Sequence, residues 1–288
     1  MDAAFREALM EGERMGSRFA LAVPETALAG LTGQQLGRRA GASVDFQDYR
    51  EYQPGDDLRT IDWSVYGRTD RLTVKLFREE VNPHLDIVLD GSRSMALEGT
   101  PKATVALQLA ALLGTAAANA RCTKAAWLGG DGFRRAQNDG LPASAWDGIE
   151  FGSNRSLTES FAILPPRLRR TGIRVLISDL FWMEDPQITL RRLGEGAAAA
   201  FVVQLVARAD VTPPEHGNIR LVDSESGETL EMFIDSMVEQ QYRDALRRHQ
   251  QSWHDACRRS GARFTTLIAE DFGMQSGQLE ELGLLVPV

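Results

Sequence analysis

Short apolar runs rich in β-branched residues constrain the fold of this chain most strongly. The clearest run is IRVLISDL at 173–180, and similar runs occur at 84–90 (HLDIVLD) and 199–207 (AAFVVQLVA). An apolar run of this length, bounded by polar turn residues, is typical of a strand buried on both faces. Helical patterns follow at 102–120 and 186–193. Strands that alternate with helices predict an α/β fold, with a mainly parallel central sheet covered by helices on both faces.

The character of the sequence changes near residue 83. Residues 1–82 are irregular and rich in charged residues, Gly and aromatics, and we expect an N-terminal helix and a β-containing lobe there. Residues 83–288 carry the alternation of strands and helices, which predicts one domain. Within this domain, residues 218–234 alternate on both sides of a turn that contains Gly227, and this pattern predicts an inserted β-hairpin.

Composition excludes several classes of protein. The formal net charge is −8, which argues against general nucleic-acid binding. The first residues contain too many acidic residues, and their apolar stretches are too short, for a secretory signal. No apolar run reaches the roughly 20 residues of a membrane helix. The two cysteines, Cys122 and Cys257, exclude a disulfide framework. We therefore expect a cytoplasmic protein with no membrane span and no nucleic-acid partner.

Polar residues follow the first predicted core strand in a pattern suited to a metal ion. Asp90 ends the strand, and Ser92 and Ser94 follow on a tight turn that can direct three oxygens to one point. Hard cations such as Mg²⁺ take oxygen ligands in octahedral geometry and retain several waters. Asp179 ends a later strand, and the carboxyl ends of parallel strands meet at one edge of the sheet. The alternative is that these side chains cap the following helices and turns.

A third loop can add a hydroxyl at the same edge. Ser156 and Thr158 stand at the start of a predicted helix at 156–168. Ser156 and Glu159 also form the pattern of a capping box, which is a sufficient structural explanation for both residues. A hydroxyl at a helix start can cap the helix and still face a metal, so both interpretations stay open, as does the choice between Ser156 and Thr158.

This arrangement resembles the metal-ion-dependent adhesion site of von Willebrand factor A domains. The resemblance implies a bound Mg²⁺ (or Mn²⁺) and an open coordination position that an Asp or Glu of a partner protein completes. The implied ligands, some of which act through water, are Asp90, Ser92, Ser94, Asp179 and either Ser156 or Thr158.

A longer resemblance covers the N-terminal part of the chain. The run DFQDYREYQPGDDLRTIDW at 45–63, followed by TDRLTVKLFREE at 69–80 and LDGSRSM at 89–95, resembles the bacterial domain-of-unknown-function 58 family. Its members are similar to von Willebrand factor A domains and are typically encoded beside MoxR-type AAA+ ATPases. Longer members carry membrane helices before this region, and this chain resembles the short soluble class. The resemblance implies a non-enzymatic, Mg²⁺-dependent protein-interaction module. Its implied partner is a MoxR-type ATPase, or the client of that ATPase, in chaperone-like maturation or regulation.

Two other functions stay open at this point. In a metal-assisted hydrolase of phosphoryl or acyl groups, Asp90 and Asp179 would hold Mg²⁺ and activate water. The sequence contains neither a phosphate-binding loop motif nor a nucleophile-elbow motif, and no base is evident near these residues. The other candidate is a structural domain whose metal site is inactive. The charged and aromatic segment 49–71, with a predicted type II turn at Gln53–Asp56, is either a structural lobe or a docking surface for a partner.

Overall fold

The computed structural model describes residues 2–24, 27, 44–79, 82–212, 216–224 and 227–288. The chain divides into two compact units. Residues 1–27 and 83–288 form the larger unit, and residues 28–82 form the smaller one. The division after residue 82 agrees with the change of character in the sequence, whereas the first residues belong to the larger unit.

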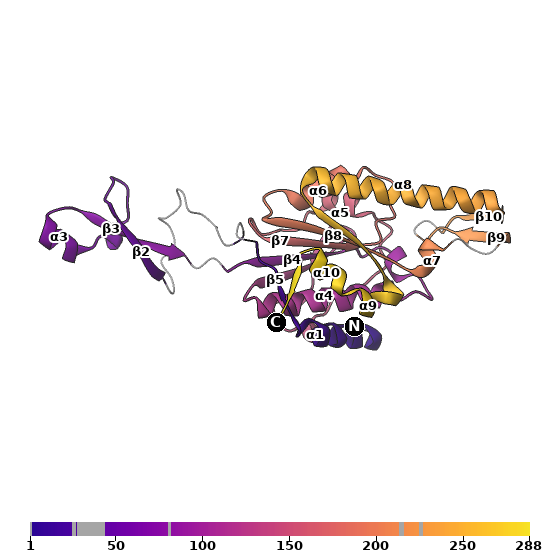
Figure 1. Cartoon of the computed structure of the whole chain (residues 1–288), viewed down its shortest axis with the longest axis horizontal. Helices are drawn as coiled ribbons and strands as arrows, with labels where there is room; N and C mark the ends of the chain where they lie inside the picture. The colour runs from indigo at the N-terminus through magenta and orange to yellow at the C-terminus, as the bar shows by residue number, and fades with distance from the viewer. Residues whose placement is uncertain (1, 25–26, 28–43, 80–81, 213–215, 225–226) are drawn as a thin grey trace. The chain divides into compact units, whose positions relative to one another are not determined.

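The larger unit alternates strands and helices along the chain (Figure 1). Its helices are α1 (Ala3–Gly16), α4 (Lys102–Asn119), α5 (Leu157–Ile163), α6 (Pro186–Gly194), α7 (Arg208–Val211), α8 (Ser236–Ser260), α9 (Phe272–Gln275) and α10 (Gly277–Glu281). Its strands are β1 (Phe19–Leu21), β4 (His84–Leu89), β5 (Thr123–Leu128), β6 (Arg134–Arg135), β7 (Ile173–Ser178), β8 (Ala199–Val206), β9 (Gly217–Val222), β10 (Thr229–Ile234), β11 (Arg263–Ile268) and β12 (Leu285–Pro287).

The central sheet has six strands in the order β11-β8-β7-β4-β5-β6. Neighbouring strands from β11 to β5 run parallel, and β6 is an antiparallel edge strand. The chain passes from the central strand β4 to β5 on one side and later to β7 on the other. The strand order therefore reverses between β4 and β7, and a crevice forms at such a switch point, beyond the carboxyl ends of the strands. The predicted α/β fold with a mainly parallel sheet is confirmed.

Two hydrophobic cores fill the space on the two faces of this sheet. Because side chains alternate along a strand, Ile87 of β4 packs in the core beneath α4, whereas Val88 packs in the core beneath α6 and α8. Figure 1 shows α4 and α1 on one face of the sheet and α6 and α8 on the other. The buried Trp253 of α8 lies in the second core. Both faces of β4 thus pack in apolar cores, which explains the apolar run 87–89 at its end.

Helix α1 packs on α4, so the predicted N-terminal domain 1–82 needs correction. A Cβ atom added at Gly12 would lie 2.2 Å from the carbonyl oxygen of Gln108, which shows how closely the two helices approach. Ala8 and Leu9 are buried in the first core, and β1 pairs antiparallel with the C-terminal strand β12. Since the partners of α1 and β1 lie far away in the sequence, no local pattern marked this packing.

The smaller unit contains β2 (Val44–Glu51), α3 (Trp63–Thr69) and β3 (Thr73–Glu79), and β2 pairs antiparallel with β3. The turn at Gln53–Asp56 forms as predicted, with the amide of Asp56 donating to the carbonyl of Gln53 at 3.0 Å. Asp62 caps α3 and accepts hydrogen bonds from Lys75 and Tyr49, both at 3.0 Å. These contacts tie the hairpin to α3 within the smaller unit.

The hairpin predicted at 218–234 is also present, as the antiparallel pair β9 and β10. By contrast, the helix predicted at 156–168 is shorter than expected, because α5 ends at Ile163. Pro165 and Pro166 follow shortly after this end, and a residue that precedes proline is disfavoured in helical conformation.

We predict that Gly12→Ala destabilises the larger unit by about 1–3 kcal/mol, because the added methyl group collides with the backbone of α4. Gly194→Ala is the matched control, since nothing lies within 4 Å of a Cβ atom there. Urea unfolding of the whole chain measures both changes. Equal stability of the two variants would show that α1 is not packed on α4.

Candidate functional site

The candidate site lies where β4 and β7 end side by side. Asp90 follows β4, and its amide donates to the carbonyl of Ile177 in β7 at 3.0 Å. Ser178 is the last residue of β7, and Asp179 comes next. The parallel register thus brings Asp90 and Asp179 to the same edge of the sheet, as expected from the sequence.

Asp90 is a buried carboxylate held by neutral donors. Its side chain is 2% exposed. One carboxylate oxygen accepts the amide of Ser92 at 2.9 Å, and the other accepts the hydroxyl of Ser178 at 2.6 Å. Burial first, and the nearby charge of Asp179 second, raise the pKa of Asp90 to about 7. A bound cation would favour the ionised form of this carboxyl group.

The two serines of the turn complete a set of oxygens beside Asp90. The hydroxyl oxygens of Ser92 and Ser94 lie 3.0 Å apart. Ligands at adjacent corners of an octahedron with metal–oxygen bonds of about 2.1 Å are separated by about 3 Å. The separation of the two hydroxyls therefore suits both a hydrogen bond and two neighbouring ligands of one ion. Asp90, Ser92 and Ser94 fit a hard divalent cation.

The hydroxyls of the third loop have partners within the chain. Ser156 caps α5 with Glu159 in a capping box, and its hydroxyl donates to Glu184 at 2.5 Å. The hydroxyl of Thr158 lies 3.0 Å from that of Thr189 in α6. These contacts give both hydroxyls the structural role that the capping interpretation expects, and a metal-ligand role for Ser156 or Thr158 stays a prediction.

Ser153 is the residue of this loop that pairs with Ser92. The two residues form a parallel bridge, and the carbonyl of Ser153 accepts the amide of Arg93 at 2.9 Å. Residues 152–155, together with Asp131, line a hollow beside the turn. Our sequence reasoning missed Ser153, because it sought hydroxyls at the start of the helix and not in the extended segment before it.

Asp179 is already paired with a cation of the chain. The ammonium group of Lys102 lies 2.9 Å from Asp179 and 3.0 Å from Asp210, and Lys102 and Asp179 are each 1% exposed. Burial alone lowers the pKa of Lys102, but the two carboxylates outweigh burial, so the pKa lies above its ordinary value. The sequence analysis did not single out Lys102, although a lysine that opens a strongly apolar helix is unusual.

Elsewhere in the described part of the chain, no metal site built from charged or sulfur ligands is evident. Among the described residues, no group of three or more His, Cys, Asp or Glu side chains is placed to hold a metal ion. The candidate site thus depends on serine hydroxyls and one carboxylate, which are ligands suited to Mg²⁺ or Mn²⁺ and poorly suited to softer metals.

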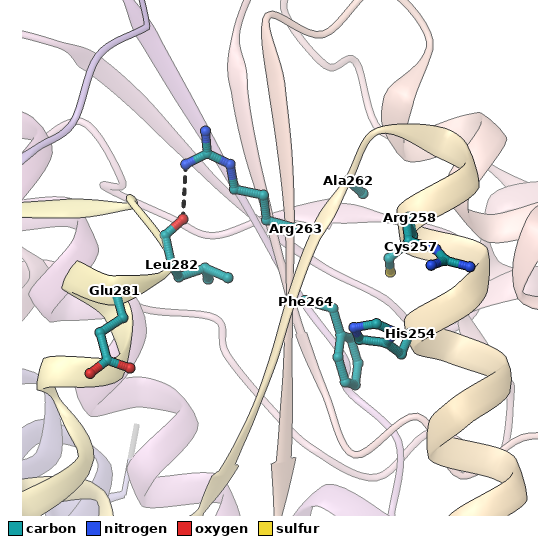
Figure 2. Close-up of a pocket in the computed structure, with 8 residues that line it drawn as sticks. All are labelled: His254, Cys257, Arg258, Ala262, Arg263, Phe264, Glu281 and Leu282. Carbon is teal, nitrogen blue, oxygen red and sulfur yellow. Dashed lines mark hydrogen bonds between the residues drawn. The ribbon is translucent and has the colours of Figure 1, made fainter.

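Another pocket lies away from the candidate site, near Arg263 at the start of β11 (Figure 2). Figure 2 shows that the guanidinium group of Arg263 points away from Arg258 and binds the carbonyl of Leu282, at 2.9 Å. Burial raises the pKa of the Cys257 thiol to about 12, so this thiol is unreactive at neutral pH. The side chains of this pocket do not converge on a common point.

Comparison with known proteins identifies relatives without an assigned activity. The family model described as "Protein of unknown function DUF58" matches residues 48–136 and 151–252. An uncharacterized protein of Mycobacterium tuberculosis is 29% identical over 255 residues, an alignment that covers 82% of this chain and 78% of the relative.

Two solved structures share the general fold class. An aerotolerance-related membrane protein from Bacteroides fragilis has 11% identity and a TM-score of 0.40, with coverage of 70% of this chain and 98% of that one. A von Willebrand factor type A protein from Catenulispora acidiphila has 12% identity and a TM-score of 0.30, with coverage of 63% and 44%. Similarity at this level gives no information about a shared activity. The von Willebrand factor A-like α/β class predicted from the sequence agrees with the strand order of the central sheet.

The cytoplasmic location predicted from the sequence is wrong by this comparison, because the similar structure from Bacteroides fragilis is described as a membrane protein. In the described ranges, no helix is long and apolar enough to cross a membrane.

The pKa of Asp90 leads to a prediction for pH dependence in EDTA. The folded protein binds a proton with a pKa of about 7, whereas the unfolded chain binds it with a pKa of about 4. This contribution to stability is fully present below pH 4 and is lost as the pH rises through 7. Relative to Asp90→Asn, the free energy of unfolding of the wild type should fall by on the order of 4 kcal/mol between pH 4 and pH 8.

Urea unfolding across this pH range provides the measurement. Adding Mg²⁺ at pH 8 should restore part of the loss in the wild type and none in Asp90→Asn, because the ion stabilises only a carboxylate. Parallel pH profiles of the two proteins would show that Asp90 has an ordinary pKa.

Proposed function

Because the chain belongs to the DUF58 family of proteins of unknown function, we propose that it is a non-enzymatic protein-interaction module that depends on Mg²⁺ or Mn²⁺. One observation carries this proposal. A buried carboxylate, Asp90, lies at the switch point of the sheet beside two serine hydroxyls that are 3.0 Å apart. These are the ligand types that hard cations prefer, at the edge where ligands of such sheets bind.

The chain's own residues prepare the site for an acidic partner. Ser178 and the amide of Ser92 fix the carboxylate of Asp90, each by one hydrogen bond. Asp90 is the single charged member of the set, since Ser92 and Ser94 are neutral. When bound, the ion therefore retains positive charge and supplies a coordination position for an Asp or Glu side chain of the partner.

The partner that we propose is a MoxR-type AAA+ ATPase, its client, or both, in chaperone-like maturation or regulation. The resemblance of 45–63, 69–80 and 89–95 to the DUF58 family supports this choice. The main alternative is a metal-assisted hydrolase, which would use Asp90 and Asp179 together. It is less well supported, because Lys102 pairs with Asp179 and because the groups bonded to Asp90 are hydroxyl and amide donors.

Binding to a purified MoxR-type ATPase from the same genome tests this function. With immobilised chain, we expect binding in Mg²⁺ and at least about tenfold weaker binding in EDTA, since a desolvated carboxylate–ion contact contributes more than 1.4 kcal/mol. Asp90→Ala should lose binding in both buffers. Thr158→Val should bind like the wild type, because the hydroxyl of Thr158 contacts Thr189.

Binding that survives both EDTA and Asp90→Ala would contradict the proposed role of the metal. Phosphoester or ester hydrolysis that requires Asp90 would favour the hydrolase instead. Normal folding with no metal-dependent binding would favour a structural domain with an inactive site.

A further inference from the structure

Lys102 occupies a position that is unfavourable for a lysine unless acids compensate it. It is the first residue of α4 and is 1% exposed. The N-terminus of a helix carries partial positive charge, so the helix itself repels an ammonium group there. Removing an ammonium group from water also costs several kcal/mol. Two independent costs therefore have to be offset at this position.

Two carboxylates supply that compensation. Asp179, which follows β7, and Asp210 of α7 lie 2.9 Å and 3.0 Å from the ammonium nitrogen. The ring of Phe181 lies below the same nitrogen, 5.8 Å from it. The ammonium group of Lys102 is therefore surrounded by partners from the chain itself, and its positive charge is balanced within the fold.

As a result, only one of the two carboxylates at this edge of the sheet is paired with a cation. Asp90 and Asp179 are neighbours at this edge, because Leu89 is paired with Ile177 in the parallel register and the amide of Asp90 donates to the carbonyl of Ile177 at 3.0 Å. Asp179 has a cation from the chain, whereas Asp90 is bonded to a hydroxyl and an amide. A divalent ion that binds beside Asp90 meets one available carboxylate and also the repulsion of the Lys102 ammonium group.

We propose that Lys102 sets the affinity and ligand set of the candidate metal site by withholding Asp179 from the ion. This inference rests on the proposed metal-dependent function. With Asp179 withheld, the site offers one carboxylate and neutral hydroxyls, so the ion binds weakly and needs a partner's carboxylate to complete its shell. Without the lysine charge, Asp179 becomes a second carboxylate ligand, and the ion binds tightly with less need for a partner.

Lys102 has a second effect that needs no metal. Asp210 accepts the amide of Ala207 at 2.8 Å through its side chain, and its carbonyl accepts the hydroxyl of Tyr242 at 2.5 Å. Through Asp210, Lys102 therefore fixes α7, the short helix that precedes the hairpin β9–β10, against α8. Loss of the lysine should loosen residues 207–212.

Calorimetry with Mn²⁺ on the full chain tests the inference. Lys102→Met should bind Mn²⁺ about tenfold more tightly than the wild type, or better, because it loses a nearby like charge and gains a carboxylate ligand. Adding Asp179→Asn to Lys102→Met should return the affinity close to the wild-type value. Lys124→Met, at a half-buried lysine in β5, is the matched control and should leave the affinity unchanged.

Lys102→Met leaves the carboxylates of Asp179 and Asp210 without this cation, which destabilises the fold. The double variant Lys102→Met/Asp210→Asn removes one of these charges and keeps Asp179 available, so it replaces the single variant if that one does not fold. Amide hydrogen exchange at 207–212, measured in EDTA, should rise in Lys102→Met and not in Lys124→Met.

The outcomes separate this inference from the proposed function. If the wild type binds Mn²⁺ through Asp90 but Lys102→Met binds no more tightly, the role of Lys102 is wrong while the metal site stands. If neither protein binds Mn²⁺, both the metal-dependent function and the role of Lys102 at the ion are overturned. Raised exchange at 207–212 would then still show that Lys102 fixes α7.

Discussion

Burial of the Asp90 carboxylate at the end of the central strand is the constraint on which the candidate site depends. Both faces of β4 are covered by apolar cores, so the strand cannot place its terminal carboxylate in bulk water. Hydroxyl and amide donors compensate this charge only in part, and the pKa of Asp90 remains raised to about 7. The fold thus disfavours the ionised form of this carboxyl group at the switch point of its sheet, and a bound cation would favour that form.

The two buried carboxylates at this edge of the sheet have their charges balanced in different ways. Asp179 is paired with Lys102 inside the fold, and Asp90 is held by dipoles. A salt bridge that is complete within the chain adds little to ligand binding, because both charges are already satisfied. The difference between the two neighbouring acids is why we propose a ligand-binding role for Asp90 and an architectural role for Asp179.

The sequence predicted those parts of the fold that depend on local patterns. Strand β7 is buried at every position, as its mostly apolar sequence predicted. The strand, turn and serine pair at 84–94 are contiguous in the sequence, so Asp90, Ser92 and Ser94 were expected close together, and the hydroxyls of Ser92 and Ser94 lie 3.0 Å apart. The position of Asp179 followed from the geometry of parallel sheets alone. The hairpin β9–β10 was predicted because its alternation surrounds a turn.

Features set by distant contacts could not be predicted in this way. Helix α1 joins the larger unit through Gly12 and the backbone of α4, which lie about a hundred residues apart in the sequence. Lys102 was missed because its partners, Asp179 after β7 and Asp210 in α7, are distant in the sequence. Ser153 was not considered beside Ser156 and Thr158. It lies next to Ser92 because a bridge joins the two loops.

In the smaller unit, the structure bears on both interpretations of the charged segment. The contacts of Asp62 with Tyr49 and Lys75 organise the unit internally, as a structural lobe requires. Trp63, however, is 62% exposed and packs edge-to-face on Tyr66, which gives the unit an apolar surface that a docking role would use. The two roles are compatible, because the network positions the helix that carries the exposed ring.

Anomalous diffraction from a crystal of the full chain grown with Mn²⁺ tests the central claim most directly. The account predicts an anomalous peak within about 2.2 Å of the hydroxyl oxygens of Ser92 and Ser94, beside Asp90, with Lys102 still bonded to Asp179. A well-diffracting crystal without a peak at this position, or with a peak held by Asp179 and a displaced Lys102, would contradict it.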